Sequence, residues 1–147
     1  MEHAFKPRGD KTTLEEGVDF TPKFDAKGLI PAIAQDADSG EIVMAAFMNA
    51  ESLARSISTG EAWYWSRSRG ELWHKGASSG SIQTIVEMRT DCDQDTILIK
   101  VRTGGNGTNC HRNVFSCFYR RVLPDASDPT ASRLESDSEH EGAESED

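Results

Sequence analysis

The chain contains only three cysteines among its 147 residues, and residues 1–11 include no apolar signal core. An odd number of cysteines cannot all pair within one chain, so we do not expect an oxidised disulfide framework. No stretch approaches the roughly 18 apolar residues that span a membrane. These absences predict a soluble, cytoplasmic protein whose cysteines serve another purpose.

Excess positive charge is also absent, since the formal net charge is -9. Residues 125–147 carry nine Asp or Glu against one Arg, which leaves 16 acidic and 15 basic residues in 1–124. This nearly neutral segment argues against a nucleic-acid-binding module, because such modules usually carry a basic surface. The acidic end has Leu134 as its only large apolar residue, and we expect residues 125–147 to form a disordered acidic tail.

The length fits one domain with two ends. We expect residues 1–23 to form a weakly structured N-terminal arm and residues 24–124 to form the domain. Asn49 and Gly60 predict the start and end of a short helix. Strands are predicted within residues 24–36 and at 41–48, 63–68, 71–75, 82–89, 96–102 and 115–122. These patterns indicate an α+β fold, mainly antiparallel β-sheet with short helices.

The most informative tract is Asp91-Cys92-Asp93-Gln94-Asp95, between two predicted strands. If side chains alternate here as in a strand, the three Asp share one face and Cys92 lies on the other. Crowded carboxylates repel one another unless a hard cation such as Mg²⁺ neutralises them, whereas a thiolate prefers Zn²⁺. The tract therefore predicts two metal sites.

Other interpretations of these residues remain open. A calcium-binding EF-hand loop is excluded, because its sixth and twelfth positions would be Thr96 and Arg102 instead of Gly and Glu. The Asp trio can also be an acidic strand end without a ligand, and free cysteines often pack as small apolar residues. Three thiolates from Cys92, Cys110 and Cys117 would instead leave one zinc position open for water, as in catalytic zinc sites.

Two segments, residues 66–70 and 75–81, concentrate hydroxyls, glycines and cations. Backbone N–H groups at glycines, hydroxyls and Arg side chains all suit phosphate, although such residues are also common in hairpin turns. The candidate phosphate contacts are Arg67, Arg69, Lys75, Ser78 and Ser79.

The ordered part of the chain resembles one family. The segments that carry the resemblance are Gly28–Asp36, Met44–Asn49, Tyr64–Gly70, Leu72–Gly76, Ser79-Gly80, Asp91–Asp95, Cys110-His111 and Ser116–Arg120. Together they are similar to phosphoribosyl-AMP cyclohydrolase of histidine biosynthesis over about residues 24–121. The acidic tail does not resemble the pyrophosphohydrolase domain that some members carry, so the resemblance implies a monofunctional form.

The resemblance implies a homodimer with Zn²⁺ and Mg²⁺ in sites shared between chains, with Cys92 of one chain meeting Cys110 and Cys117 of the other. It assigns these cysteines to Zn²⁺, and Asp91, Asp93 and Asp95 to Mg²⁺. One departure is Arg112-Asn113, where members commonly have Thr-Gly after the Cys-His pair.

The implied reaction opens the adenine ring of 1-(5-phosphoribosyl)-AMP at N1–C6. The ribosyl group on N1 makes C6 electrophilic, so water can add there and the ring opens without release of ammonia. His111 beside Cys110 is the first candidate general base and His74 the second, because imidazole titrates near neutral pH. A zinc nucleobase deaminase is the alternative, although its Pro-Cys-x-x-Cys signature is absent. A non-catalytic zinc module that binds RNA is favoured only by the Trp and Arg content of residues 63–75.

Overall fold

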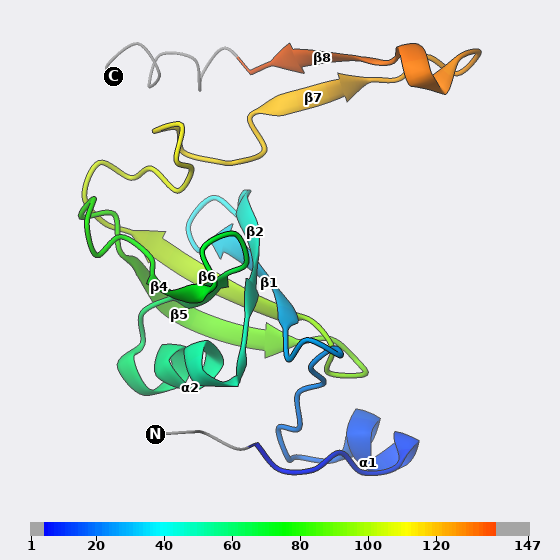
Figure 1. Cartoon of the computed structure of the whole chain (residues 1–147), viewed down its shortest axis with the longest axis vertical. Helices are drawn as coiled ribbons and strands as arrows, with labels where there is room; N and C mark the ends of the chain where they lie inside the picture. The colour runs from blue at the N-terminus through cyan, green and yellow to red at the C-terminus, as the bar shows by residue number, and fades with distance from the viewer. Residues whose placement is uncertain (1–4, 138–147) are drawn as a thin grey trace.

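The computed structural model describes residues 5–137, which form an α+β domain built on one curled sheet (Figure 1). The six strands lie in the order β4-β3-β2-β1-β6-β5, and every neighbouring pair is antiparallel except β1 and β6. This confirms the predicted fold class. The strands are β1 (Ile30–Asp36), β2 (Ile42–Met48), β3 (Trp63–Ser66), β4 (Glu71–His74), β5 (Gln83–Thr90) and β6 (Ile97–Thr103).

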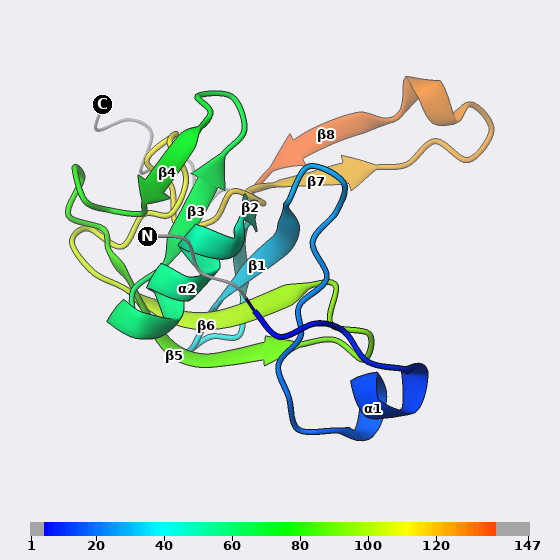
Figure 2. The same cartoon turned by 60° about the horizontal axis from the view of Figure 1, so that its bottom comes forward.

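Helix α2 (Ala50–Thr59) covers part of the sheet, as Figure 2 shows. Asn49 caps its start through a hydrogen bond from the backbone N–H of Ser52, and Gly60 ends it in the left-handed conformation, as predicted. The helix buries Leu53 in the core. The other fully buried large apolar side chains come from the sheet and the loop after β6: Ile30, Val43, Met48, Tyr64, Ile97, Ile99, Val101 and Val114. Within residues 5–137, no helix is long and apolar enough to cross a membrane.

The two loops that flank β6 leave it at opposite ends. Residues 91–95 connect β5 to the start of β6, and residues 104–119 follow its last residue. Residues 104–119 then return to the start of β2, where the backbone N–H of Cys117 donates to the carbonyl of Val43 at 2.7 Å. We name the two ends of the sheet after these loops, the aspartate end and the cysteine end.

The N-terminal arm is better ordered than its composition predicts. Helix α1 (Lys11–Glu16) begins at Asp10, whose side chain accepts a hydrogen bond from Thr13. The guanidinium of Arg8 donates to the carbonyl of Asp93 at 2.7 Å, and the side-chain oxygen of Gln94 accepts from the N–H of Thr21 at 2.8 Å. Phe5 and Phe20 also pack against the core. Residues 5–23 are therefore more regular than predicted, because tertiary hydrogen bonds and apolar contacts hold them on the domain.

Two predictions near the C-terminus also need correction. Residues 115–119 are not a strand, and β7 covers only Arg120–Leu123. Part of the predicted disordered tail is regular, since β7 pairs with β8 (Arg133–Ser136) across the 3₁₀ helix Pro129–Ala131. The Asp125 carboxylate accepts from the N–H groups of Ser127 and Asp128, so local hydrogen bonds shape the turn despite the acidic composition. The rest of that prediction, residues 138–147, lies outside the described residues.

Candidate metal and active site

The three aspartates converge in a tight turn. One carboxylate oxygen from each of Asp91, Asp93 and Asp95 lies within 4.8 Å of the others. Gln94 takes the left-handed conformation with φ 56°, which reverses the chain. The Asp91 carboxylate accepts from the N–H groups of Asp95 at 2.9 Å and Thr96 at 3.1 Å. The carboxylates therefore meet through a loop, and the predicted strand alternation at residues 91–95 was wrong.

The carboxylates of this turn have unequal proton affinities. Hydrogen bonding to Asp91, then to Asp93, raises the pKa of Asp95. Partial burial acts to raise the pKa of Asp91, but its hydrogen bonds with Asp95 and with the backbone outweigh burial, so this pKa is lowered. Such a pattern arises when crowded carboxylates share a proton, and a divalent cation can replace that proton.

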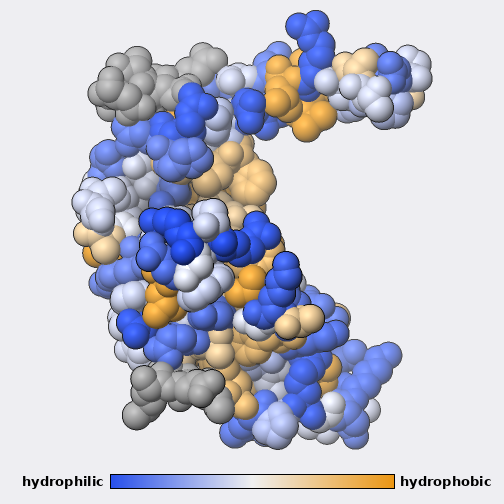
Figure 3. Space-filling view, viewed as in Figure 1, coloured by the Kyte–Doolittle hydropathy of each residue, from blue (hydrophilic) through white to orange (hydrophobic). Residues whose placement is uncertain are grey.

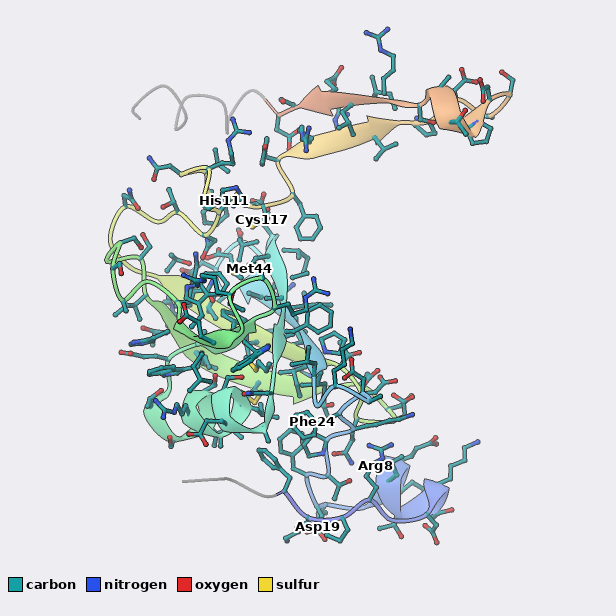
Figure 4. All side chains as sticks on the ribbon, viewed as in Figure 1. Arg8, Asp19, Phe24, Met44, His111 and Cys117 are labelled. Carbon is teal, nitrogen blue, oxygen red and sulfur yellow. The ribbon has the colours of Figure 1, made fainter. Side chains whose placement is uncertain are left out.

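The N-terminal arm fixes this turn from outside, and Arg8 and Gln94 are the residues that sequence reasoning missed. Besides accepting from Thr21, the Gln94 side chain donates to the carbonyl of Leu14 at 3.1 Å. Figure 4 shows Arg8 on the arm next to the domain. The only signal in the sequence was Gln94, an amide residue inside an acidic tract. That signal does not predict which residues its side chain contacts.

Cys110 and Cys117 lie together at the cysteine end. Burial, then the charge of Cys110 and a hydrogen bond with it, raises the pKa of Cys117 to about 12. The side chain of Ser116 donates to the carbonyl of Ile42 at 2.8 Å, which fixes the segment before Cys117 against β2. Asn113 stands where members of the family commonly have Gly, and it has φ 63°. Asn is one of the few residues besides Gly that adopts this left-handed conformation readily.

A buried polar network supports the cysteine loop from the sheet. Tyr64 donates its hydroxyl to the side-chain oxygen of Gln83 at 2.6 Å, and Gln83 donates its amide to Asn109 at 2.8 Å. Asn109 in turn accepts from Thr103 at 2.9 Å and donates to the carbonyl of Phe115 at 2.8 Å. The network thus joins the first residue of β5, the last of β6 and both sides of the loop that holds the two cysteines.

Cys92 is not part of this pair. It is exposed and lies at the aspartate end, in the turn between β5 and β6. Among the described residues, only the Asp trio forms a group of three or more His, Cys, Asp or Glu side chains with ligand atoms within 4.8 Å of one another. One copy of the chain therefore does not assemble a three-thiolate site by itself.

Lys75 lies closer to the cysteines than its assignment as a phosphate contact implied. Its side chain is only 7% exposed, and its ammonium lies 5.2 Å from the centre of the Trp73 ring. Burial lowers the pKa of Lys75, while the negative charges of Cys117 and Cys110 act in the opposite direction. The structure thus brings a buried cation to the two thiols.

The two histidines have different surroundings. His111 is exposed and follows Cys110 directly, and Figure 4 shows it near Cys117. His74 is held by a 2.8 Å contact between its Nε2 and Glu61, and its ring stacks on Trp63 at 4.2 Å between centroids. His111 is therefore available to a substrate, whereas His74 is engaged in contacts between strands.

The remaining candidate contacts fall into two groups. Arg67 lies 4.1 Å over the Phe47 ring and lines an open groove of about 540 Å³ with Trp65 and Trp73. Arg69 pairs with Glu71 at 3.5 Å. Ser78 and Ser79 are exposed on the loop of residues 76–81. This loop packs on the start of the cysteine loop, because a Cβ at Gly105 would lie 2.7 Å from the Gly80 carbonyl oxygen.

The fold and these sites define an α+β protein with a carboxylate cluster at one end of its sheet and a thiol pair at the other. The family model described as phosphoribosyl-AMP cyclohydrolase matches residues 44–119, which contain all six candidate metal ligands. The chain belongs to the phosphoribosyl-AMP cyclohydrolase family, and the resemblance seen in its motifs is confirmed.

Several relatives carry that name. The one from Chelativorans sp. (strain BNC1) is 54% identical over 116 residues, 79% of this chain and 84% of the relative. The Brucella anthropi relative is 51% identical over 119 residues, 81% of this chain and 84% of its own length. The Brucella canis relative is 54% identical over 114 residues, 78% and 82% of the two chains.

Proposed function

We propose that this chain hydrolyses the N1–C6 bond of the adenine ring in 1-(5-phosphoribosyl)-AMP, a step of L-histidine biosynthesis. The product is the 5'-phosphoribosyl-formimino-aminoimidazole carboxamide ribotide. Family membership over residues 44–119 carries the proposal. The location we propose is the cytoplasm, because none of the three cysteines forms a disulfide within residues 5–137, as is usual in a reducing compartment.

Mg²⁺ is the cation we propose for Asp91, Asp93 and Asp95. Three carboxylate oxygens within 4.8 Å of one another supply the hard oxygen donors that Mg²⁺ prefers, and the remaining positions suit water or phosphate oxygens. Neutralising the turn would also let a phosphorylated substrate approach carboxylates that otherwise repel it. Arg8 and Gln94 hold the turn in place from the arm.

Zn²⁺ is the ion we propose for Cys92, Cys110 and Cys117. The pair at the cysteine end supplies two thiolates, and Cys92 at the aspartate end is too far along the sheet to join them within one chain. We therefore propose a homodimer with sites shared between chains, in which the partner's Cys92 completes each set. When bound, zinc supplies the Lewis acidity that eases deprotonation of water.

His111, Lys75 and the polar loops perform the remaining steps that we propose. His111 takes the proton of the water that adds to C6 and returns it to N1 as the ring opens. Lys75, buried beside Cys110 and Cys117, offsets the negative charge of the thiolates. Arg67, Arg69, Ser78 and Ser79 remain our candidates for the substrate phosphates.

A direct test strips the purified chain of metals, restores Zn²⁺ and Mg²⁺ separately and together, and follows ring opening of 1-(5-phosphoribosyl)-AMP by ultraviolet absorbance. We expect turnover with both metals and no release of ammonia. Absence of ring opening with both metals restored would overturn the proposal. Ammonia in stoichiometric amount would instead identify a nucleotide deaminase.

A further inference from the structure

The hairpin of β7 and β8 lacks support from its own chain. It forms a separate two-stranded sheet, and all eight of its strand residues are exposed. Figures 1 and 2 show it projecting from the body of the molecule. A lone two-stranded hairpin is marginally stable in water. Some other surface is therefore needed to hold it.

One face of this hairpin is suited to burial. Val122 and Leu134 are directly opposed partners in the ladder and are 62% and 53% exposed. Arg120 lies on the same face, two residues before Val122, because alternate strand residues share a face. Glu135 and Arg121 lie on the other face and pair with each other. The first face therefore sets two apolar side chains opposite each other beside one cation, whereas on the second face Leu123 lies opposite Arg133 and next to the Arg121–Glu135 pair.

At the other end of the molecule, the arm and the aspartate turn enclose a groove of about 400 Å³. Its apolar lining includes Leu14, Phe20 and Val18, which is completely exposed in the single chain. Acidic side chains from α1 and the turn, among them Glu15 and Asp91, complete the lining. This combination of apolar and acidic groups complements the apolar and basic face of the hairpin. Cys92 lines the same groove.

The hairpin and α1 project from opposite ends of the molecule toward the same side, and the face between them is hollowed (Figure 3). Apolar surface is exposed on that hollowed side (Figure 3). Two copies related by a two-fold axis with these sides facing each other bring the hairpin of each copy to the α1 end of the other. Such an assembly stops at two copies, because each hairpin occupies one groove and none is left over.

We propose that the hairpin of residues 120–136 docks in the groove between residues 14–20 and 90–94 of a second copy of this chain. The inference rests on the proposed function, because the split zinc ligands require the partner's Cys92 to reach Cys117. Cys117 precedes β7 by three residues, which span at most roughly 10 Å. The groove that Cys92 of the partner subunit lines therefore lies beside Arg120, where the hairpin begins. Each copy thus places its hairpin on the other copy, and this exchange brings the partner's Cys92 to Cys110 and Cys117.

Photo-crosslinking of the full chain tests the contact without depending on turnover. Benzoylphenylalanine is placed at position 134 in unlabelled chains, which are refolded with an excess of ¹⁵N-labelled wild-type chains, irradiated and digested. We expect crosslinks from the unlabelled hairpin to labelled peptides of residues 12–23 or 89–100. The same probe at position 135, on the opposite face of β8, is the control and should give a yield lower by about tenfold.

Crosslinks that stay within one chain, or that reach other labelled peptides, would overturn the docking inference, as would equal yields from positions 134 and 135. Failure of the proposed function has a separate signature. Ring opening with no labelled crosslink leaves the function standing and removes the docking. The expected crosslinks in a chain that does not open the ring would support the interface and refute the activity. A second measurement is the dimer dissociation constant of Leu134→Lys, which should rise by about tenfold or more.

Discussion

The side-chain amide of Gln83, at the start of β5, donates to the side-chain oxygen of Asn109 at 2.8 Å, and both residues are buried. This contact ties the cysteine loop to the sheet one residue before Cys110. Asn109 has three partners here, since it also accepts from Thr103 and donates to Phe115. A single amide thus sets the position from which the thiol pair is built.

The first prediction removes that amide. Asn109→Ala removes the acceptor of the Gln83 and Thr103 side chains and the donor to the Phe115 carbonyl, so we expect a loss of about 2–3 kcal/mol in the free energy of unfolding. Urea denaturation checks this, and the zinc content should fall as well. Ser78→Ala, an exposed residue of the adjoining loop, is the control with a loss of under about 1 kcal/mol. Equal losses would show that the network does not support the loop.

The second prediction concerns the aspartate turn. Asp93→Asn removes one charged oxygen from the proposed Mg²⁺ site, so about tenfold more Mg²⁺ should be needed for half-maximal turnover. The zinc content should stay unchanged, because Asp93→Asn leaves the thiols of Cys92, Cys110 and Cys117 in place. Asp38→Asn, exposed and outside the turn, controls for general charge effects. Zinc loss with unchanged Mg²⁺ dependence would contradict the assignment.

The third prediction tests whether Gln94 couples the N-terminal arm to the aspartate turn. Gln94→Gly keeps a residue that tolerates φ 56° but deletes the side chain that binds Thr21 and Leu14. We expect faster backbone hydrogen exchange at residues 14–21 and a higher Mg²⁺ requirement. Lys27→Gly, in an exposed turn away from residues 91–95, is the control. Unchanged exchange in residues 14–21 would show that Gln94 does not anchor the arm.

Local signals were enough for much of the fold. The Asn49 cap, the Gly60 end and the turn between β1 and β2 depend on a few neighbouring residues, and each lies where the sequence places it. The parallel pairing of β1 with β6 could not be predicted, because these strands are about 60 residues apart and no local pattern specifies their neighbours.

The candidate site shows the same division. The residue types at 91–95 indicated the carboxylate cluster, but the φ 56° turn at Gln94 that builds it depends on contacts with the arm. Lys75 belonged to a Ser/Gly segment that suits phosphate, yet the curled sheet buries it beside Cys110 and Cys117. Composition also failed to predict the β7–β8 hairpin. The acidic composition of residues 125–147 as a whole does not reveal the local hydrogen bonds of Asp125 that form the turn.

The fourth prediction tests Lys75 as the cation beside the thiols. Lys75→Met keeps the buried alkyl chain and removes the charge, so zinc should bind about tenfold more weakly in competition with a chelator. Lys75→Arg keeps a cation and should lose less affinity. Lys27→Met, on an exposed turn, should leave zinc affinity unchanged. Equal affinity of the wild type and Lys75→Met would remove this role.

The last prediction tests whether each zinc site is built from two chains. If Cys92 of one copy joins Cys110 and Cys117 of the other, Cys92→Ala and Cys110→Ala chains are each inactive alone. In their heterodimer one shared site collects both lesions and the other receives none. Random pairing makes about half of the dimers mixed, each with one intact site of two, so refolding an equal mixture should recover roughly a quarter of wild-type turnover. Zinc bound per dimer should recover in step. Each mutant refolded alone is the control, and no recovery would mean that all three cysteines act within one chain.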